Sequence, residues 1–137
     1  MAISWKAEVG INHTPAYQVS GRPFASASVI YNTTARVVYL PYVSRWFQVF
    51  NRGASDLRVG FSAFGVEGGG GGNYYLTVPP SGSGGFGKSD IYEMKVSNIW
   101  LYGATAGTCD VVAGLTTIPR QRTSGSLGPN FSGSVGV

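Results

Sequence analysis

The stretch YVSRWFQVFNRGASDLRVGF, residues 42–61, decides the fold class of this chain. Residues 42–50 are apolar on both faces, which predicts a central strand with the core on one side and a loop or partner on the other. Residues 51–55 have the composition of a tight turn. Residues 56–64 then alternate, with Leu57 and Val59 facing inward, so the stretch predicts a hairpin of two antiparallel strands.

The same two-residue period recurs along the rest of the chain, and no segment has a convincing helical period. We therefore predict an all-β chain, a single β-sandwich or jelly roll of about eight antiparallel strands. The predicted strands cover residues 3–9, 24–31, 35–40, 42–50, 56–64, 73–78, 90–102 and 109–118.

The pattern places this β-sandwich domain over residues 1–119. The glycine-rich residues 65–72 are expected to form a flexible tip between two strands. Residues 120–137 consist of Gly, Ser, Thr and Pro with isolated apolar residues, too few for a core of their own. We expect this tail to be a Gly/Ser-rich C-terminal arm laid on a neighbour, or a disordered tail.

The chain is poor in the residues that do chemistry. It has one His, one Cys and 6 carboxylates in 137 residues, against 21 Gly, 3 Trp, 8 Tyr and 7 Phe. Catalysis and metal binding need His, Cys, Asp or Glu held close together, and Asp90 and Glu93 fall on opposite faces of their predicted strand. His13 is interpreted as a polar turn residue and Cys109 as a small buried hydrophobe. We therefore predict no enzyme, no catalytic residue, no cofactor and no metal.

Residues 82–89, GSGGFGKS, match the P-loop pattern, in which backbone amides and a Lys hold phosphate groups. A true P-loop follows a parallel strand and opens a helix, whereas the residues after Ser89 alternate at least as well as a strand does. The chain also lacks the alternating helices of a doubly wound sheet. A nucleotide-binding function through residues 82–89 is therefore kept as a remote alternative.

Aromatic and Arg residues supply the candidate contact surface. Tyr42, Trp46 and Phe50 share the strand face that points away from the predicted core, either as a second core layer or as a contact between subunits. Tyr75 and Trp100 instead indicate a sugar-stacking platform, as in a carbohydrate-binding or adhesive β-sandwich. The predicted interface residues are Trp46, Phe50, Tyr42, Arg45, Trp5, Arg120, Arg122 and Phe131.

The charge and hydropathy of the chain limit the classes of partner that we expect. The net charge is +4, and the basic residues are spread along the chain rather than clustered, which argues against nucleic acid as a partner. The N-terminal residues alternate polar and apolar, unlike a signal peptide, and no apolar run approaches the ~20 residues of a membrane helix. We expect neither membrane association nor secretion by a signal peptide.

Four segments, residues 47–61, 73–79, 99–103 and 112–119, together resemble small single-jelly-roll proteins of icosahedral virus particles. These include penton and minor capsid proteins of large DNA viruses, and cement or decoration proteins of tailed phages. The likeness spans residues 42–119 and lies in the pattern of strands and turns.

The resemblance implies a non-enzymatic structural protein of the virion, assembled in the interior of the host cell. It implies a symmetric homo-oligomer that also binds major capsid or other virion proteins, with a surface glycan as a further candidate ligand. Residues 3–9 and 119–137 would be the arms exchanged between subunits, and residues 81–89 a loop between strands.

Overall fold

The computed structural model describes residues 22–68, 73–81, 87–124, 128–132 and 136–137. The strand predicted over residues 3–9, and Trp5 within it, lie outside this part of the chain. Its elements are β1 (Arg22–Tyr31), β2 (Arg36–Tyr39), β3 (Tyr42–Asn51), β4 (Leu57–Gly60), α2 (Ala63–Glu67), β5 (Tyr75–Val78), β6 (Asn98–Tyr102), β7 (Gly107–Pro119) and two 3-10 helices, η2 (Arg120–Thr123) and η3 (Pro129–Phe131).

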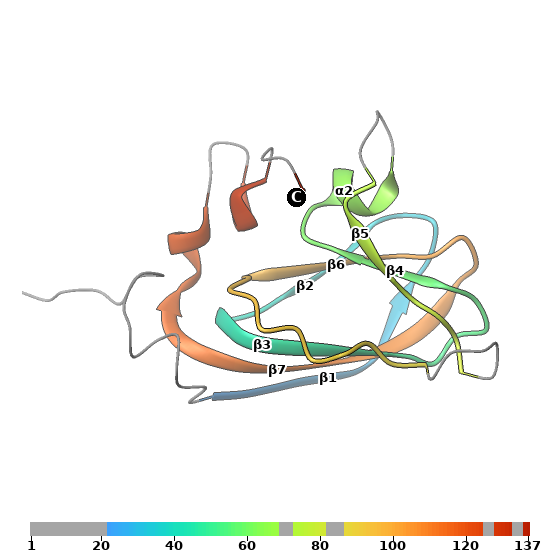
Figure 1. Ribbon diagram of the computed structural model, residues 1–137, viewed down its shortest axis with the longest axis horizontal. Coiled ribbons are helices and arrows are strands. Elements are labelled where there is room, and N and C mark those ends of the chain that lie inside the picture. Colours follow the sequence, from blue (N-terminus) through green and yellow to red (C-terminus); the bar gives the residue numbers. More distant parts are fainter. Residues whose placement is uncertain (1–21, 69–72, 82–86, 125–127, 133–135) are drawn as a thin grey trace, which may run out of the picture.

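The strands form two antiparallel sheets that lie face to face (Figure 1). One sheet has the strand order β1-β7-β3 and the other the order β2-β6-β4-β5. Side chains from both sheets fill one core, in which Phe47 of β3 and Leu101 of β6 are 0% exposed. The predicted all-β class is confirmed, because the period of two placed alternate side chains of each strand in this core.

The outer edge of β3 is covered by the irregular segment formed by residues 87–96. The backbones of Phe47 and Tyr92 exchange two hydrogen bonds of 2.9 Å, and the Ser44 N–H donates to the Val96 carbonyl over 2.9 Å. Between these points the Ser44 hydroxyl enters the ladder, donating to the Met94 carbonyl and accepting from the Val96 N–H over 3.1 Å. The strand predicted over residues 90–102, with an irregularity at Ser97 and Asn98, is therefore a regular strand only from Asn98 onward, because before that point a side chain replaces a backbone partner.

The return strand predicted over residues 56–64 ends early, at Gly60. The Ser62 hydroxyl accepts from the Gly65 N–H over 3.0 Å and caps α2, and Gly68 ends the helix with φ of 70°. The predicted tip over residues 65–72 is thus wrong as far as Glu67, and residues 69–72 lie outside the described part. A capping Ser followed by a Gly six residues later overrides the strand alternation.

The described part of the tail packs on the sandwich of its own chain. Thr123 of η2 is 0% exposed and Asn130 of η3 is 5% exposed. The Asn130 side chain accepts from the Ser97 N–H over 2.7 Å and donates to the Asn98 carbonyl over 2.6 Å. One amide therefore fixes the tail to the start of β6, which composition alone does not reveal.

A buried hydrogen-bond network joins the two sheets around Tyr31, which is 0% exposed. The Tyr31 hydroxyl donates to the Asn51 side-chain oxygen over 2.8 Å, and this oxygen also accepts from the Gly53 N–H over 2.9 Å. The Asn51 side-chain nitrogen donates to the carbonyls of Ser55 and Val78 over 2.8 and 2.9 Å. One Asn thus ties the ends of β1, β3 and β5 to the turn after β3.

Three glycines from two turns, the one after β3 and the one between β6 and β7, enclose the Tyr31 ring. A Cβ atom at Gly103 or at Gly107 would come within 2.6 Å of the Tyr31 side chain, and one at Gly53 would overlap its hydroxyl. These glycines are needed because the ring occupies the space that any side chain there would fill.

We predict that Tyr31→Phe lowers the free energy of unfolding by about 1–3 kcal/mol, because it leaves the buried Asn51 oxygen without this donor. Urea denaturation followed by circular dichroism measures the change. The matched control is Tyr39→Phe, whose side chain is 60% exposed, and it is expected to leave stability unchanged. Equal stability of Tyr31→Phe and the wild type would contradict the network's role.

Candidate functional site

The predicted sugar-stacking residues share one face but do not form one platform. Tyr75 and Trp100 each pair with Gly60, so they project from the outer face of the four-stranded sheet on either side of β4. Val66 of α2 covers Gly60, where a Cβ atom would lie 2.5 Å from a Val66 methyl carbon. Arg58 stacks on the Tyr75 ring, 4.5 Å from its centroid. The Arg58 guanidinium thus covers one face of the Tyr75 ring, and α2 separates this ring from Trp100.

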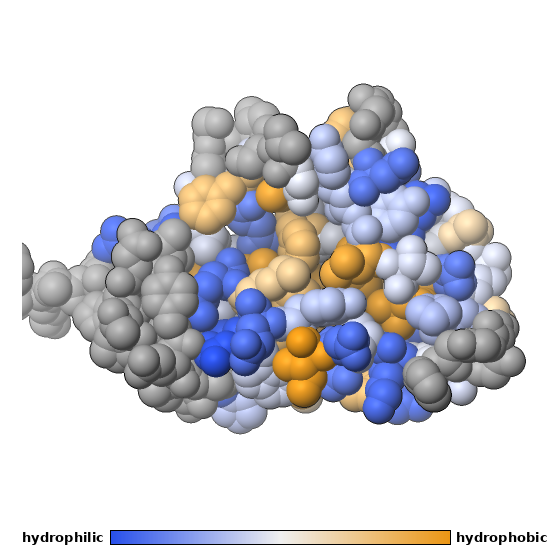
Figure 2. Space-filling view, viewed as in Figure 1, coloured by the Kyte–Doolittle hydropathy of each residue, from blue (hydrophilic) through white to orange (hydrophobic). Residues whose placement is uncertain are grey.

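Trp100 instead lines an apolar hollow of about 540 Å³ between α2 and the C-terminal segments. Figure 2 shows hydrophobic residues on the floor of the recess between these two parts of the molecule. Phe64 of α2, 52% exposed, lies on one side of the hollow, and Pro129 of η3 lies on the other. Phe131, which we predicted for the interface, follows on η3 and is 40% exposed.

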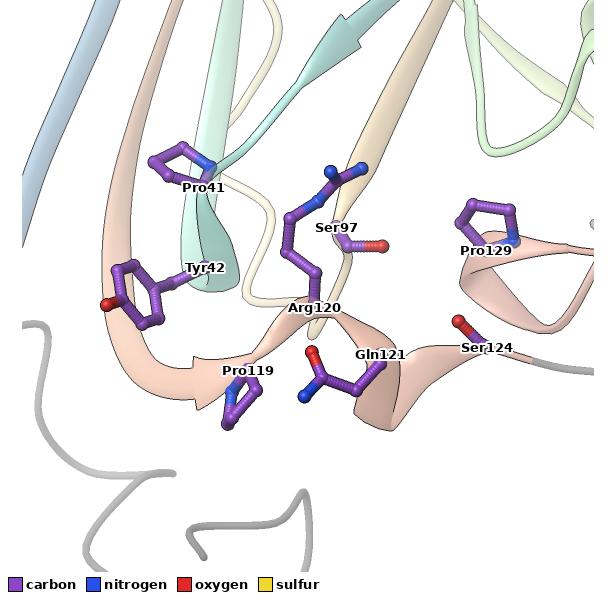
Figure 3. A pocket seen from close by; sticks show the side chains of 8 residues that line it. All are labelled: Pro41, Tyr42, Ser97, Pro119, Arg120, Gln121, Ser124 and Pro129. Carbon is purple, nitrogen blue, oxygen red and sulfur yellow. The ribbon is translucent and has the colours of Figure 1, made fainter.

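A second hollow, of about 500 Å³, lies at the end of the sandwich where β3 begins and β7 ends (Figure 3). Two predicted interface residues, Tyr42 and Arg120, line it together. The Arg22 guanidinium lies over the Tyr42 ring, 4.4 Å from its centroid. Arg120 donates to the Asn98 side-chain oxygen over 2.6 Å. The sequence did not indicate this hollow, because its walls come from four segments that are distant along the chain.

The other predicted basic residues lie apart from this hollow's lining. Arg45 forms an ion pair with Glu93 at 2.9 Å, which fixes the segment 87–96 to β3. Arg122 is exposed on η2. In the P-loop-like stretch, residues 82–86 lie outside the described part, Lys88 is exposed, and the buried Ser89 hydroxyl accepts from the Val49 N–H over 3.0 Å.

The outer face of the three-stranded sheet carries the remaining predicted aromatics. Trp46 and Phe50 are half-buried on it, whereas Phe47 and Val49 between them point into the core. Trp46 lies opposite Gly114 of β7, and Phe50 lies opposite Asp110. We call this surface, with Ala25 of β1 and Val112 of β7, the outer sheet face.

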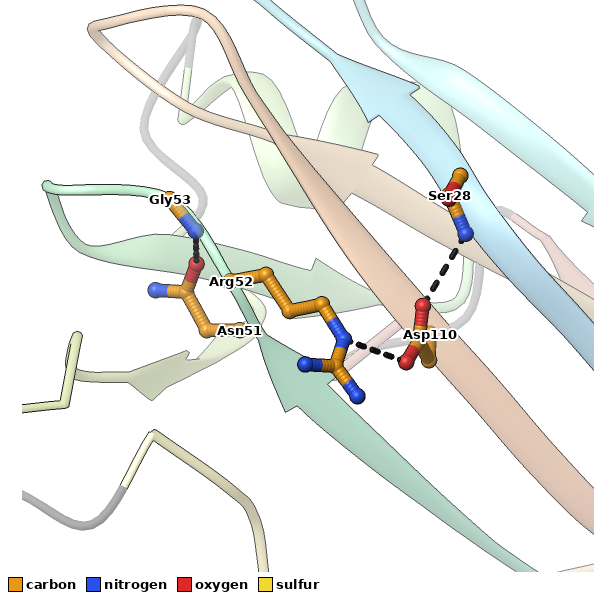
Figure 4. Close-up of polar contacts among 5 residues, drawn as sticks. All are labelled: Ser28, Asn51, Arg52, Gly53 and Asp110. Atoms are coloured by element: carbon orange, nitrogen blue, oxygen red, sulfur yellow. Dashed lines mark hydrogen bonds and ion pairs between the residues drawn. The ribbon is translucent and has the colours of Figure 1, made fainter.

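A shallow hollow of about 220 Å³ lies on the outer sheet face, bordered by Ala25, Phe50, Arg52 and Asp110. Asp110 accepts from the Ser28 N–H over 2.9 Å and pairs with the Arg52 guanidinium (Figure 4). The Ser28 hydrogen bond, with help from Arg52, holds the pKa of Asp110 below its usual value. A fixed ion pair therefore borders a surface on which Trp46, Phe50 and Val112 lie around the polar Gln48.

Ser28 makes this arrangement through a β-bulge. The register of β1 against β7 shifts between Ser26 and Val29, and Ser28 takes a φ of 56°. Our sequence reasoning missed Ser28, Arg52 and Asp110 as a group. The available signal was Asp110 itself, the one charged residue inside an apolar strand, but nothing in the sequence shows the bulge opposite to it.

Cys109 lies in the core, 0% exposed, and burial raises the pKa of its thiol to about 12, with Asp110 adding to the effect. Its thiolate, the reactive form, is therefore suppressed at neutral pH. Within the described residues, no three His, Cys, Asp or Glu side chains come together in a way that would hold a metal ion. No helix in that part of the chain is long and apolar enough to span a membrane.

Compared with protein-family models, with curated proteins and with solved structures, the chain matches none of them.

We predict that the Cys109 thiol makes the protein less stable at alkaline pH. The unfolded thiol ionises near pH 9.0 and the folded one near pH 12, so the folded chain holds more protons in this window and stability falls as pH rises. The thiol's contribution at pH 10 should be about 1.4 kcal/mol lower than at pH 7. Urea denaturation at both pH values measures it, with Cys109→Ala as the comparison. The same fall in Cys109→Ala would show that the thiol is not the cause.

Proposed function

We propose that the two sheets form a jelly roll in which residues 87–96 are an additional, irregular strand, so that the total is eight. This segment bonds to β3 on the side away from β7, which extends that sheet by one member. In chain order the segment is then the sixth strand, and the paired strands become first with eighth, second with seventh, third with sixth and fourth with fifth. Such nested pairing is what results when one long antiparallel hairpin is rolled into two sheets, which is the arrangement of a jelly roll.

We further propose that the protein is a non-enzymatic structural protein that self-associates through the outer sheet face. The observation that carries this proposal is the pair of half-buried aromatics on β3, Trp46 and Phe50. Beside them, β7 presents Gly114 and Val112 on the same face of the sheet, and β1 follows on the far side of β7. Aromatic residues on an apolar patch with a charged border are the features of protein interfaces. The Arg52–Asp110 pair supplies such a border.

By analogy with the jelly-roll proteins of virus particles, we propose that the assembly is part of a virion, as a minor capsid, vertex, or cement or decoration protein. Its partners would be further copies of the chain and neighbouring capsid proteins. The analogy rests on the nested strand pairing and on the strand-and-turn pattern of residues 42–119.

The two alternative functions have less support. A carbohydrate-binding platform needs an open pair of aromatic faces, but Val66 stands between Tyr75 and Trp100. A P-loop needs a helix after its Lys and Ser, but Ser89 is followed by the irregular segment along β3.

We predict that Ala25→Glu weakens self-association, because it places a charge on the outer sheet face without removing any core side chain. Loss of a central contact is expected to weaken association about 10-fold or more, as for interface hot spots. Sedimentation velocity over a concentration series measures the effect. The matched control is Thr77→Glu, an exposed strand position on the other sheet.

The wild type and Thr77→Glu are expected to have the same association constant. Ala25→Glu is expected to be monomeric over the same range of protein concentration. A wild type that stays monomeric at its highest soluble concentration would contradict self-association. Equal association of all three proteins would contradict the assignment to this face.

A further inference from the structure

The hollow at the end of the sandwich contains a cation, Arg120, that none of the described carboxylates pairs with. Arg120 lines the hollow, and its Nε is buried without a hydrogen-bond partner. Neither the ion pair Arg45–Glu93 nor the ion pair Arg52–Asp110 includes Arg120, which thus has no carboxylate partner among the described residues. Arg120 as a whole is partly exposed, so its positive charge can be reached from the hollow, while its unused Nε donor costs free energy that an anion bound to the guanidinium would offset.

The neutral contacts of Arg120 position its guanidinium without cancelling its charge. One terminal nitrogen donates to the Asn98 side-chain oxygen over 2.6 Å, and the Tyr39 ring centroid lies 5.1 Å from the guanidinium carbon. Figure 3 shows the side chain running from the rim, near Pro119, to a position beside Ser97. The guanidinium is therefore held in one orientation before any ligand arrives, which lowers the entropic cost of binding.

The remaining lining residues suit a small anionic group. Gln121 and Ser124 supply an amide and a hydroxyl, each able to donate, and Tyr42 adds an aromatic wall with a hydroxyl. Arg22 stacks on the outer side of that wall, 4.4 Å from the ring centroid, and adds a second positive charge nearby. The volume of about 500 Å³ is within the range of small-molecule sites.

We propose that this hollow is a carboxylate-binding site, in which Arg120 is the principal ligand-binding residue and Gln121 and Ser124 donate at its mouth. A planar carboxylate matches a guanidinium in geometry and in charge, whereas a phosphate dianion would call for further cations in the lining. The carboxylate has two sources, a free organic acid or an Asp or Glu of a second copy of the chain. This site is separate from the outer sheet face, so it does not depend on the self-association proposed above.

The test is a titration of the full-length protein with sodium acetate, followed by the NMR signals of the Arg Nε–Hε groups. Sodium chloride at the same ionic strength is the reference, and Arg36, exposed on β2, is the internal control. We expect the Arg120 signal to move and saturate with acetate only, while the Arg36 signal does not saturate. Arg120→Gln identifies the signal.

A second variant keeps Arg120 and its contacts in place. Gln121→Glu puts a tethered carboxylate at the mouth of the hollow, so it should shift the Arg120 signal in the same direction as acetate and remove the response to added acetate. The matched control is Thr77→Glu, an exposed position on the four-stranded sheet outside the lining of the hollow, which should leave the acetate response unchanged.

The two sources give different results, and both support the site. Saturation by acetate in the monomeric Ala25→Glu background indicates a free organic acid. If the Arg120 signal instead shifts with protein concentration, and Gln121→Glu abolishes this shift, the carboxylate belongs to a second copy of the chain. If neither acetate nor protein concentration moves the Arg120 signal beyond that of Arg36, the proposal is overturned.

Discussion

The hydrogen bond from the Tyr31 hydroxyl to the Asn51 side chain is the interaction on which the arrangement of the two sheets depends. It lies where β1 and β3 end, and the same Asn51 amide also fixes the turn after β3 and the end of β5. Because the site is fully buried, each of these polar groups would cost free energy if its partner were lost. Burial also raises the pKa of Tyr31, so its hydroxyl stays a donor throughout the neutral range. The turns therefore have one compatible geometry, and the strands that enter them are placed by it.

With those ends fixed, the edge of β3 would be open to pairing with another chain, and residues 87–96 cover it. Two serines shape this cover: the hydroxyl of Ser89 bonds to the Val49 N–H, and that of Ser44 bonds at both Met94 and Val96. The outer edge of β3 is thereby closed by backbone hydrogen bonds together with those of the two serines, which protects it against edge-to-edge association. The surface that we propose for specific contact is the outer sheet face, where Trp46 follows a register shift of β3 and Phe50 lies in its regular part.

Much of this could be predicted from the period of two. It placed Phe47 and Val49 in the core and identified the turn after β3, because alternate burial leaves a direct record in the sequence. It did not predict α2, because the alternation of Leu57 and Val59 continues into Phe61 while the decisive contact is a cap at Ser62. Nor did it predict the Arg120 hollow or the group around Asp110, since both depend on segments brought together only by the fold. The local pattern of apolar residues shows which side chains are buried. Sites made by segments that are distant in the sequence depend on the topology, which that pattern does not show.

The proposed assembly has the outer sheet face of one copy in contact with another copy of the chain. The most direct test is an isotope-filtered NOE experiment on an equal mixture of labelled and unlabelled protein, which detects only contacts between copies. We expect intermolecular NOEs to the side chains of Trp46, Phe50 and Val112 and none to those of α2. Intermolecular NOEs confined to α2 or to the apolar hollow beside Trp100 would contradict it.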